Sequence, residues 1–170
     1  GRQPALTSID DARSLLAAVE NATASPVTKI ASRLLALTTV RPGVLRQAEW
    51  TEFEDLDGKA PTWRIPAAKM KLTAARKADI REEFVLPLAP AAVEAIKAIK
   101  PLTGRSRYLF PSNRSFFNVM SENAIGYLYN RAGYQGRHVP HGWRATFSTI
   151  MNELAEREER GSDRAVIDLM

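Results

Sequence analysis

Apolar residues recur at helical spacing through much of this chain. A first helix is predicted over residues 8–23, where they lie three and four positions apart: Ile9, Ala12, Leu15, Leu16 and Val19. Pro26 suits the first turn of a second helix, which Pro42 and Gly43 end. Further helices are predicted from Pro90, over residues 121–132 ahead of Gly133, from Pro140 to about residue 160, and after a cap at Ser162.

Three short segments with strand character interrupt this helical pattern. They cover residues 50–55, 62–66 and 83–88, and the Asp57-Gly58 turn separates the first two. A polar, basic segment over residues 67–81 lies between the last two, which predicts a hairpin with a basic loop. Residues 101–114 are predicted to form a loop. The pattern therefore indicates a chain that is mainly helix with one small sheet.

Charge and composition narrow the classes of function. The net charge is +5, which favours a polyanionic partner through neutralisation of phosphates. The chain contains no cysteine, which excludes disulfides, thiolate zinc sites and cysteine nucleophiles. No apolar stretch approaches the roughly 20 residues that a membrane span needs, so no membrane association is expected.

Candidate chemistry first appears in the tetrapeptide His-Gly-Trp-Arg, which contains His141 and Arg144. Positions three apart at the start of a helix share one face, near the positive end of the helix dipole. This arrangement suits an anion such as phosphate. The alternative is that His141 caps or packs the helix while Arg144 forms a surface ion pair.

Two other basic positions stand at structural corners. Arg41 precedes Pro42 at a predicted helix end, where its side chain either binds the last carbonyls or projects into a cleft. Lys69 and Lys71 share one face of a strand that enters the basic loop. They either decorate a solvated hairpin or deliver a proton donor to a leaving oxygen.

Together these positions suit cleavage of a phosphodiester. Arginine forks bind non-bridging oxygens in pairs, and fixed positive charge stabilises the transition state. Lysine and histidine can divide the proton transfer. Such a site requires no metal, since fixed cations supply the positive charge.

The order Arg…Lys…His-x-x-Arg resembles the tyrosine recombinase, or phage integrase, family, and especially integrases of genomic islands and satellite phages. Five stretches carry the resemblance over residues 30–170: TTVRPGVLRQAEW, WRIPAAKMK, FVLPLAP, YLFPS and HGWRATFSTIMNE. The resemblance implies a single catalytic domain over residues 1–170. It also implies an α+β fold that is mainly α with a small antiparallel three-stranded sheet.

The resemblance also implies roles for individual residues. Arg41 matches the first catalytic arginine, and His141 and Arg144 match the box with the second arginine. Lys71 matches the hairpin lysine, with Lys69 and Lys77 as the alternatives. The implied reaction is DNA strand exchange through a covalent 3′-phosphotyrosine, without a metal or another cofactor. Contacts to the phosphate backbone are expected from Lys69, Lys77 and Arg137.

Two departures from the family pattern stand out. The family's nucleophilic tyrosine follows the His-x-x-Arg box, whereas all four tyrosines precede it: Tyr108, Tyr127, Tyr129 and Tyr134. We therefore expect the chain to stop before the nucleophile, so that it binds DNA without covalent attachment and is inactive by itself. Val44 stands where the family usually has a glutamate that supports the arginines.

The implied partners are double-stranded DNA attachment sites, bound by a homotetramer of the full-length protein in the bacterial cytoplasm. The isolated chain is expected to be a monomer. Two other functions fit the same residues, a degenerate DNA-binding module without cleavage activity and an enzyme of the type IB topoisomerase kind. His138 and the three tryptophans are expected to have structural roles.

Overall fold

Helices and one small sheet make up the computed structural model, which describes residues 2–70 and 83–169, with side chains as far as residue 161. Helix α1 (Ile9–Asn21) begins where Ser8 accepts a hydrogen bond from the Asp11 N–H, and α2 (Pro26–Thr38) begins at its proline. The first two helices were predicted within two to four residues of these bounds.

The sheet contains three antiparallel strands, β1 (Phe53–Glu54), β2 (Thr62–Ile65) and β3 (Phe84–Pro87), in the order β1-β2-β3. Trp63 on the central strand is fully buried and stacks on Phe53 with ring centroids 5.0 Å apart. The fold is therefore mainly α with a small antiparallel three-stranded sheet, as predicted. The strand predicted at 50–55 is shorter than expected, because the 3-10 turn η1 (Trp50–Glu52) takes up its first half.

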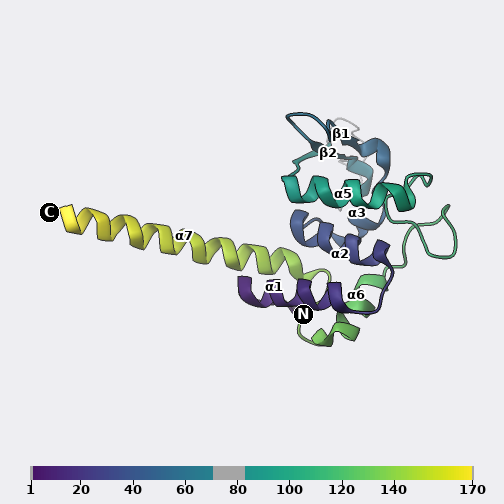
Figure 1. The fold of residues 1–170 in the computed structure, drawn as a ribbon. Coiled ribbons are helices and arrows are strands. Elements are labelled where there is room, and N and C mark those ends of the chain that lie inside the picture. The colour runs from purple at the N-terminus through teal and green to yellow at the C-terminus, as the bar shows by residue number, and fades with distance from the viewer. Residues whose placement is uncertain (1, 71–82, 170) are drawn as a thin grey trace.

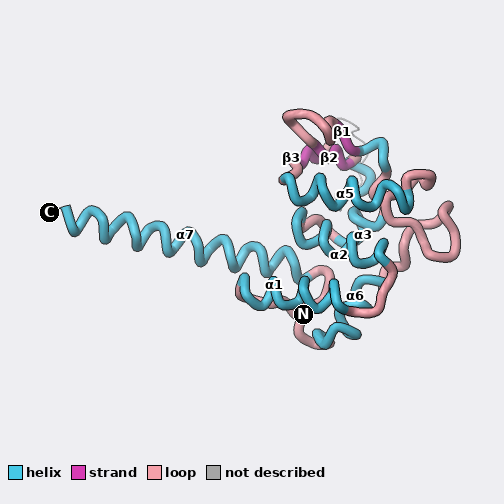
Figure 2. The backbone as a smooth tube through the Cα atoms, viewed as in Figure 1, coloured by secondary structure: helices cyan, strands magenta, loops and turns pink. Residues whose placement is uncertain are grey.

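Figure 1 shows the sheet at one end of the molecule, next to α5 (Pro90–Thr103). Helices α2 and α3 (Pro42–Arg46) lie beyond α5, followed by α1 and α6 (Ala124–Tyr129). Figure 2 shows the strands confined to that end, while helices and loops form the rest. The core lies between α2 and α5, where the fully buried side chains include Leu34, Leu35, Ile96 and Ile99. In the described part of the chain no helix is long and apolar enough to span a membrane.

Helices α5 and α6 have bounds that differ from the prediction. Helix α5 continues through Pro101 to Thr103, because the buried Thr103 hydroxyl bonds the carbonyl of Leu109 at 2.7 Å and holds the last turn. Helix α6 (Ala124–Tyr129) is short and runs into a wide turn, η3 (Asn130–Tyr134). The helix was predicted over residues 121–132 with a cap at Gly133, whereas α6 ends at Tyr129 and Gly133 lies inside η3, with a φ of 95° that favours glycine.

Helix α7 (Gly142–Leu169) is continuous, so the prediction that Ser162 caps a separate helix was wrong. Only Gly161 weakens this segment, and one glycine costs a helix about 1 kcal/mol, too little to end it. Residues 151–161 are all exposed, and Figure 1 shows α7 running away from the other helices.

Candidate functional site

Arg41 and Arg144 line the same pocket, which has a volume of about 250 Å³. Its walls come from the end of α2, the start of the short helix α3 (Pro42–Arg46), the sheet and the first turn of α7. The other lining residues are Thr38, Thr39, Val40, Val44, Ile65, Met70, Phe84 and Leu86. The fold therefore joins the two arginines that the sequence placed far apart.

A tight corner between two helices holds Arg41 in place. Thr39 ends α2 in the left-handed conformation, with φ 52°, and its N–H donates to the Leu35 carbonyl at 2.8 Å. Arg41 is then the N-cap of α3, and its own carbonyl accepts from the N–H of Val44 at 3.0 Å. The backbone of Arg41 thus caps α3, and the half-buried side chain of Arg41 lines the pocket.

The pocket combines positive charge with apolar walls. Val44 is 4% exposed and lines it at the position where the resembled family usually has a glutamate. None of the described lining residues is an aspartate or glutamate, and within the described chain neither arginine forms an ion pair. Two guanidinium groups without a neighbouring carboxylate favour an anion that accepts paired hydrogen bonds.

His141 lies in a second hollow beside this pocket. It is exposed and lines a groove of about 500 Å³ together with Pro42, Gly43, Arg46 and Tyr127. His141 therefore shares this groove with the two residues that follow Arg41, whereas Arg144 lines the pocket on the other side of that corner. The structure places the histidine next to the arginine pair without bringing it into the same pocket.

A chain of buried hydrogen bonds fixes the first turn of α7. Trp143 donates from Nε1 to the Tyr129 hydroxyl at 2.8 Å, and this hydroxyl shares a hydrogen bond of 2.7 Å with Ser32 Oγ. None of the three residues is more than 4% exposed, and burial raises the pKa of Tyr129 to about 12. Because Ser32 belongs to α2, which leads to Arg41, this chain connects the elements that carry the two arginines.

The N-terminal segment closes over the same turn. The Leu6 N–H donates to His138 Nδ1 at 3.1 Å, and Thr146 Oγ1 donates to the Leu6 carbonyl at 2.6 Å. A Cβ atom at Gly142 would lie 2.6 Å from the Pro4 carbonyl, so glycine is required for this close approach. Sequence reasoning missed these contacts, since no local pattern signals them. The structural role expected for His138 is confirmed.

Burial of His138 predicts a dependence of stability on pH. Because His138 is 1% exposed, burial lowers the pKa of its imidazole from 6.5 to about 4. Between these values the unfolded chain binds a proton that the folded chain does not, so folding loses stability as pH falls. The free energy of unfolding should drop by about 3 kcal/mol from pH 7.5 to pH 4 on account of this residue.

Urea unfolding at a series of pH values measures this loss. The same measurement on His138→Gln isolates the contribution of His138, because every other group that titrates in this range is present in both proteins. The difference between the two proteins should shrink as pH falls through the window from 6.5 to 4. Parallel pH profiles would contradict the assignment.

The other predicted site residues have different surroundings. Lys69 is a partly buried residue within a carboxylate cluster, whereas it was expected to contact backbone phosphates. Arg137 is exposed, with its guanidinium 4.6 Å from the centre of the Tyr134 ring. Lys71 and Lys77 lie outside the described residues.

The tyrosines and the acidic residues were also compared with the arginine pocket and with the requirements of a metal site. None of the four tyrosines is among the described residues that line the arginine pocket, and Tyr129 is buried in the core. In the described ranges no three histidine, aspartate or glutamate side chains gather as a metal site.

Two solved structures share this fold. XerA recombinase superimposes with a TM-score of 0.60 at 23% identity, covering 86% of this chain and 50% of that one. A lambda integrase dimer bound to a COC′ core site gives a TM-score of 0.59 at 16% identity, covering 86% and 40%. At these identities the likeness shows the fold.

Sequence comparison identifies the family. Prophage integrase IntA of Escherichia coli (strain K12) is 33% identical over 117 residues, which is 69% of this chain and 26% of that protein. The integrase of Enterobacteria phage P4 is 33% identical over 133 residues, 75% of this chain and 30% of that protein. The chain thus spans less than a third of the length of either. The model of the phage integrase family matches residues 6–157, and the chain belongs to that family.

Proposed function

We propose that this chain is the catalytic domain of a site-specific DNA recombinase, an integrase that acts on double-stranded DNA. The observation that carries the proposal is the pocket in which Arg41 and Arg144 meet without a described carboxylate. Such a pocket suits the non-bridging oxygens of one phosphodiester, because two guanidinium groups can bind them in pairs.

The proposed reaction is a transesterification. A tyrosine oxygen attacks phosphorus, the bond to the 5′ oxygen breaks, and the strand stays attached as a 3′-phosphotyrosine. Arg41 and Arg144 stabilise the added negative charge, while Lys71 and His141 share the transfer of a proton to the departing oxygen. The phosphotyrosine ester retains the bond energy, so a later 5′ hydroxyl can reverse the step.

We propose that the attacking tyrosine is supplied from outside these 170 residues. None of the chain's four tyrosines lines the described pocket, and Tyr129, buried with a pKa raised to about 12, is the least suited to ionise. The 170 residues should then bind DNA without forming an adduct. The proposed assembly is a homotetramer of the complete gene product on paired attachment sites in the cytoplasm, with the isolated chain a monomer.

One observation favours a second candidate, a DNA-binding module that does not cleave. Val44 leaves the pocket without the carboxylate that usually supports the arginines in the resembled family. A type IB topoisomerase reaction, which uses the same chemistry, would differ in that the original 5′ hydroxyl attacks the phosphotyrosine and reseals the same strand without exchange.

A suicide DNA substrate with the attachment site distinguishes these possibilities. The complete gene product that contains this chain should form a protein–DNA adduct that survives denaturant, and the 170 residues alone should not. Exchange between two sites would separate a recombinase from a topoisomerase. Tight binding of a confirmed site without any adduct would favour the module.

Binding of duplex DNA by the 170-residue chain should depend strongly on salt. With three or four phosphates neutralised, affinity should fall roughly 40- to 150-fold between 50 and 200 mM salt. Because both arginines are proposed to bind one phosphate, Arg41→Ala and Arg144→Ala should each remove part of the roughly 0.9 that this phosphate contributes to the slope of log K against log salt.

Arg13 provides a matched control, since it is exposed on α1 and lies outside the pocket. Fluorescence anisotropy with a labelled duplex gives the slopes. Equal losses in the Arg13→Ala and Arg144→Ala variants would show that general charge binds the DNA, and would contradict a specific arginine pocket.

A further inference from the structure

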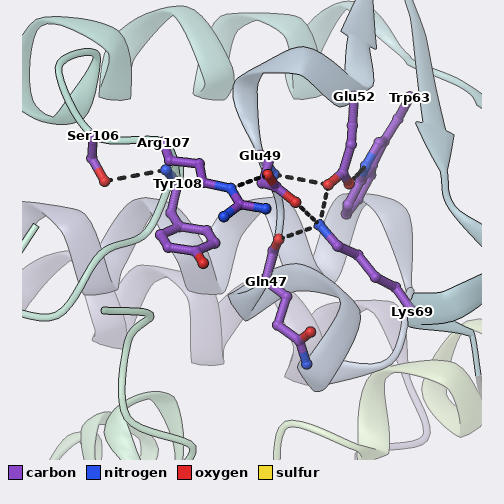
Figure 3. Close-up of polar contacts among 8 residues, drawn as sticks. All are labelled: Gln47, Glu49, Glu52, Trp63, Lys69, Ser106, Arg107 and Tyr108. Carbon is purple, nitrogen blue, oxygen red and sulfur yellow. Dashed lines mark hydrogen bonds and ion pairs between the residues drawn. The ribbon is translucent and has the colours of Figure 1, made fainter. Parts of the chain in front are cut away.

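Lys69 lies at the centre of a compact polar cluster, which Figure 3 shows. Its Nζ donates to the Gln47 carbonyl at 2.7 Å, to Glu49 Oε2 at 2.5 Å and to Glu52 Oε2. The Lys69 side chain is 14% exposed, and the side chain of Glu52 is 5% exposed. The ammonium is thus paired with two carboxylates and largely withdrawn from solvent.

The two carboxylates are themselves fixed from other directions. Glu52 accepts from Trp63 Nε1 at 3.1 Å and from the Glu49 N–H at 3.1 Å, and Arg107 binds Glu49 (Figure 3). Burial opposes ionisation of Glu49, but hydrogen bonds from Arg107 and Lys69 keep the pKa of this carboxyl below its usual value. Glu49 therefore stays ionised at neutral pH.

This cluster connects two walls of the arginine pocket. Lys69 ends the turn η2 (Ala67–Lys69), and the next residue, Met70, lines the pocket on the sheet side. Gln47 directly follows α3, the short helix that begins at the Arg41 cap. A single side chain thus bonds the sheet side of the pocket to the element that holds Arg41.

We propose that Lys69 is a positioning residue, which sets the spacing between the sheet wall and the Arg41 wall of the pocket. Its charge is compensated by Glu49 and Glu52, and with Arg107 the cluster contains two cations and two carboxylates, so Lys69 offers no uncompensated charge to a phosphate. This inference rests on the proposed cleavage function and replaces the earlier expectation that Lys69 contacts DNA.

Binding by the 170-residue chain separates the two roles of Lys69. A lysine that contacts a phosphate would, on change to methionine, reduce the salt slope by about 0.9. If Lys69 is instead a positioning residue, Lys69→Met should leave the slope of log K against log salt unchanged. Glu52→Gln sharpens the contrast between the two roles. If Lys69 binds a phosphate, this variant frees the lysine from one carboxylate and strengthens DNA binding. If Lys69 is a positioning residue, the variant disturbs its position and does not strengthen DNA binding.

Cleavage by the complete gene product provides the second measurement. At saturating DNA, Lys69→Met and Glu52→Gln should both slow adduct formation by about 10- to 100-fold, the effect of misplacing a catalytic group by about 1 Å. Lys69→Arg should restore most of the rate, because a guanidinium also pairs with two carboxylates. Lys97→Met is the control, since Lys97 forms an ion pair with Asp57 away from the pocket.

The outcomes are distinct. If the unmodified protein binds no duplex, the proposed function fails and the inference fails with it. If the unmodified protein cleaves DNA, two results would overturn the inference alone. One is a lower salt slope in Lys69→Met, and the other is a normal rate of cleavage by Lys69→Met. Thermal melting identifies a variant that fails to fold, and Glu49→Gln, at a more exposed member of the cluster, then takes the place of Glu52→Gln.

Discussion

Replacing Arg144 by alanine is expected to slow strand cleavage by about 10²- to 10³-fold, the effect of removing one preorganised donor from a charged transition state. The pocket amplifies the contribution, because Val44, Ile65 and Leu86 line it with apolar surface and weaken screening by water. The rate of adduct formation by the complete gene product on a suicide substrate, at saturating DNA, measures this loss.

Arg144→Lys is the matched comparison for that variant. It keeps the positive charge but loses the planar fork, so its rate should lie between those of Arg144→Ala and the unmodified protein. Both variants should melt like the unmodified protein, since the Arg144 side chain is exposed. A normal rate in Arg144→Ala would mean that this pocket does not hold the scissile phosphate.

Removing the hydroxyl of Tyr129 is expected to destabilise the fold by about 2–4 kcal/mol, because buried polar groups that lose their partner cost about 1–3 kcal/mol each. In Tyr129→Phe the indole N–H of Trp143 and the hydroxyl of Ser32 both lose their bond to this oxygen. Urea unfolding at pH 7 measures the change.

Two further variants test this explanation. Tyr127→Phe, two residues earlier on the same helix, should change stability by less than about 0.5 kcal/mol, since Tyr127 is exposed. Adding Ser32→Ala to Tyr129→Phe should cost less than the sum of the two single changes, because one orphaned hydroxyl disappears. Strict additivity would show that Ser32 and Tyr129 are not coupled.

Local patterns were sufficient to predict most of the helices and the three short strands. Proline positions and apolar spacing located α1, α2 and α5, since these signals act within a few residues. The corner after α2 was only partly anticipated. Pro42 was read as the end of a helix, but it also begins α3, because proline suits a first helical turn as well as a stop.

The candidate site was predictable as a set of residues and not as an arrangement. Arg41 and Arg144 were identified from their motifs, and the shared pocket agrees with that grouping, although their catalytic roles stay predictions. The position of His141 in the adjacent groove depends on how α7 packs, which no local pattern encodes. The surroundings of Lys69 were missed for the same reason, since its carboxylate partners precede it by 17 and 20 residues.

The hydrogen bonds that close the N-terminal segment over α7 also determine when the site can form. Leu6 waits for partners that lie 132 and 140 residues further along the chain, at His138 and Thr146. At about 5–20 residues per second, a ribosome needs on the order of ten seconds to make that stretch. The turn that carries Arg144 therefore gains its contacts with the N-terminal segment only after residues 138–146 have been made, on the order of ten seconds after Leu6.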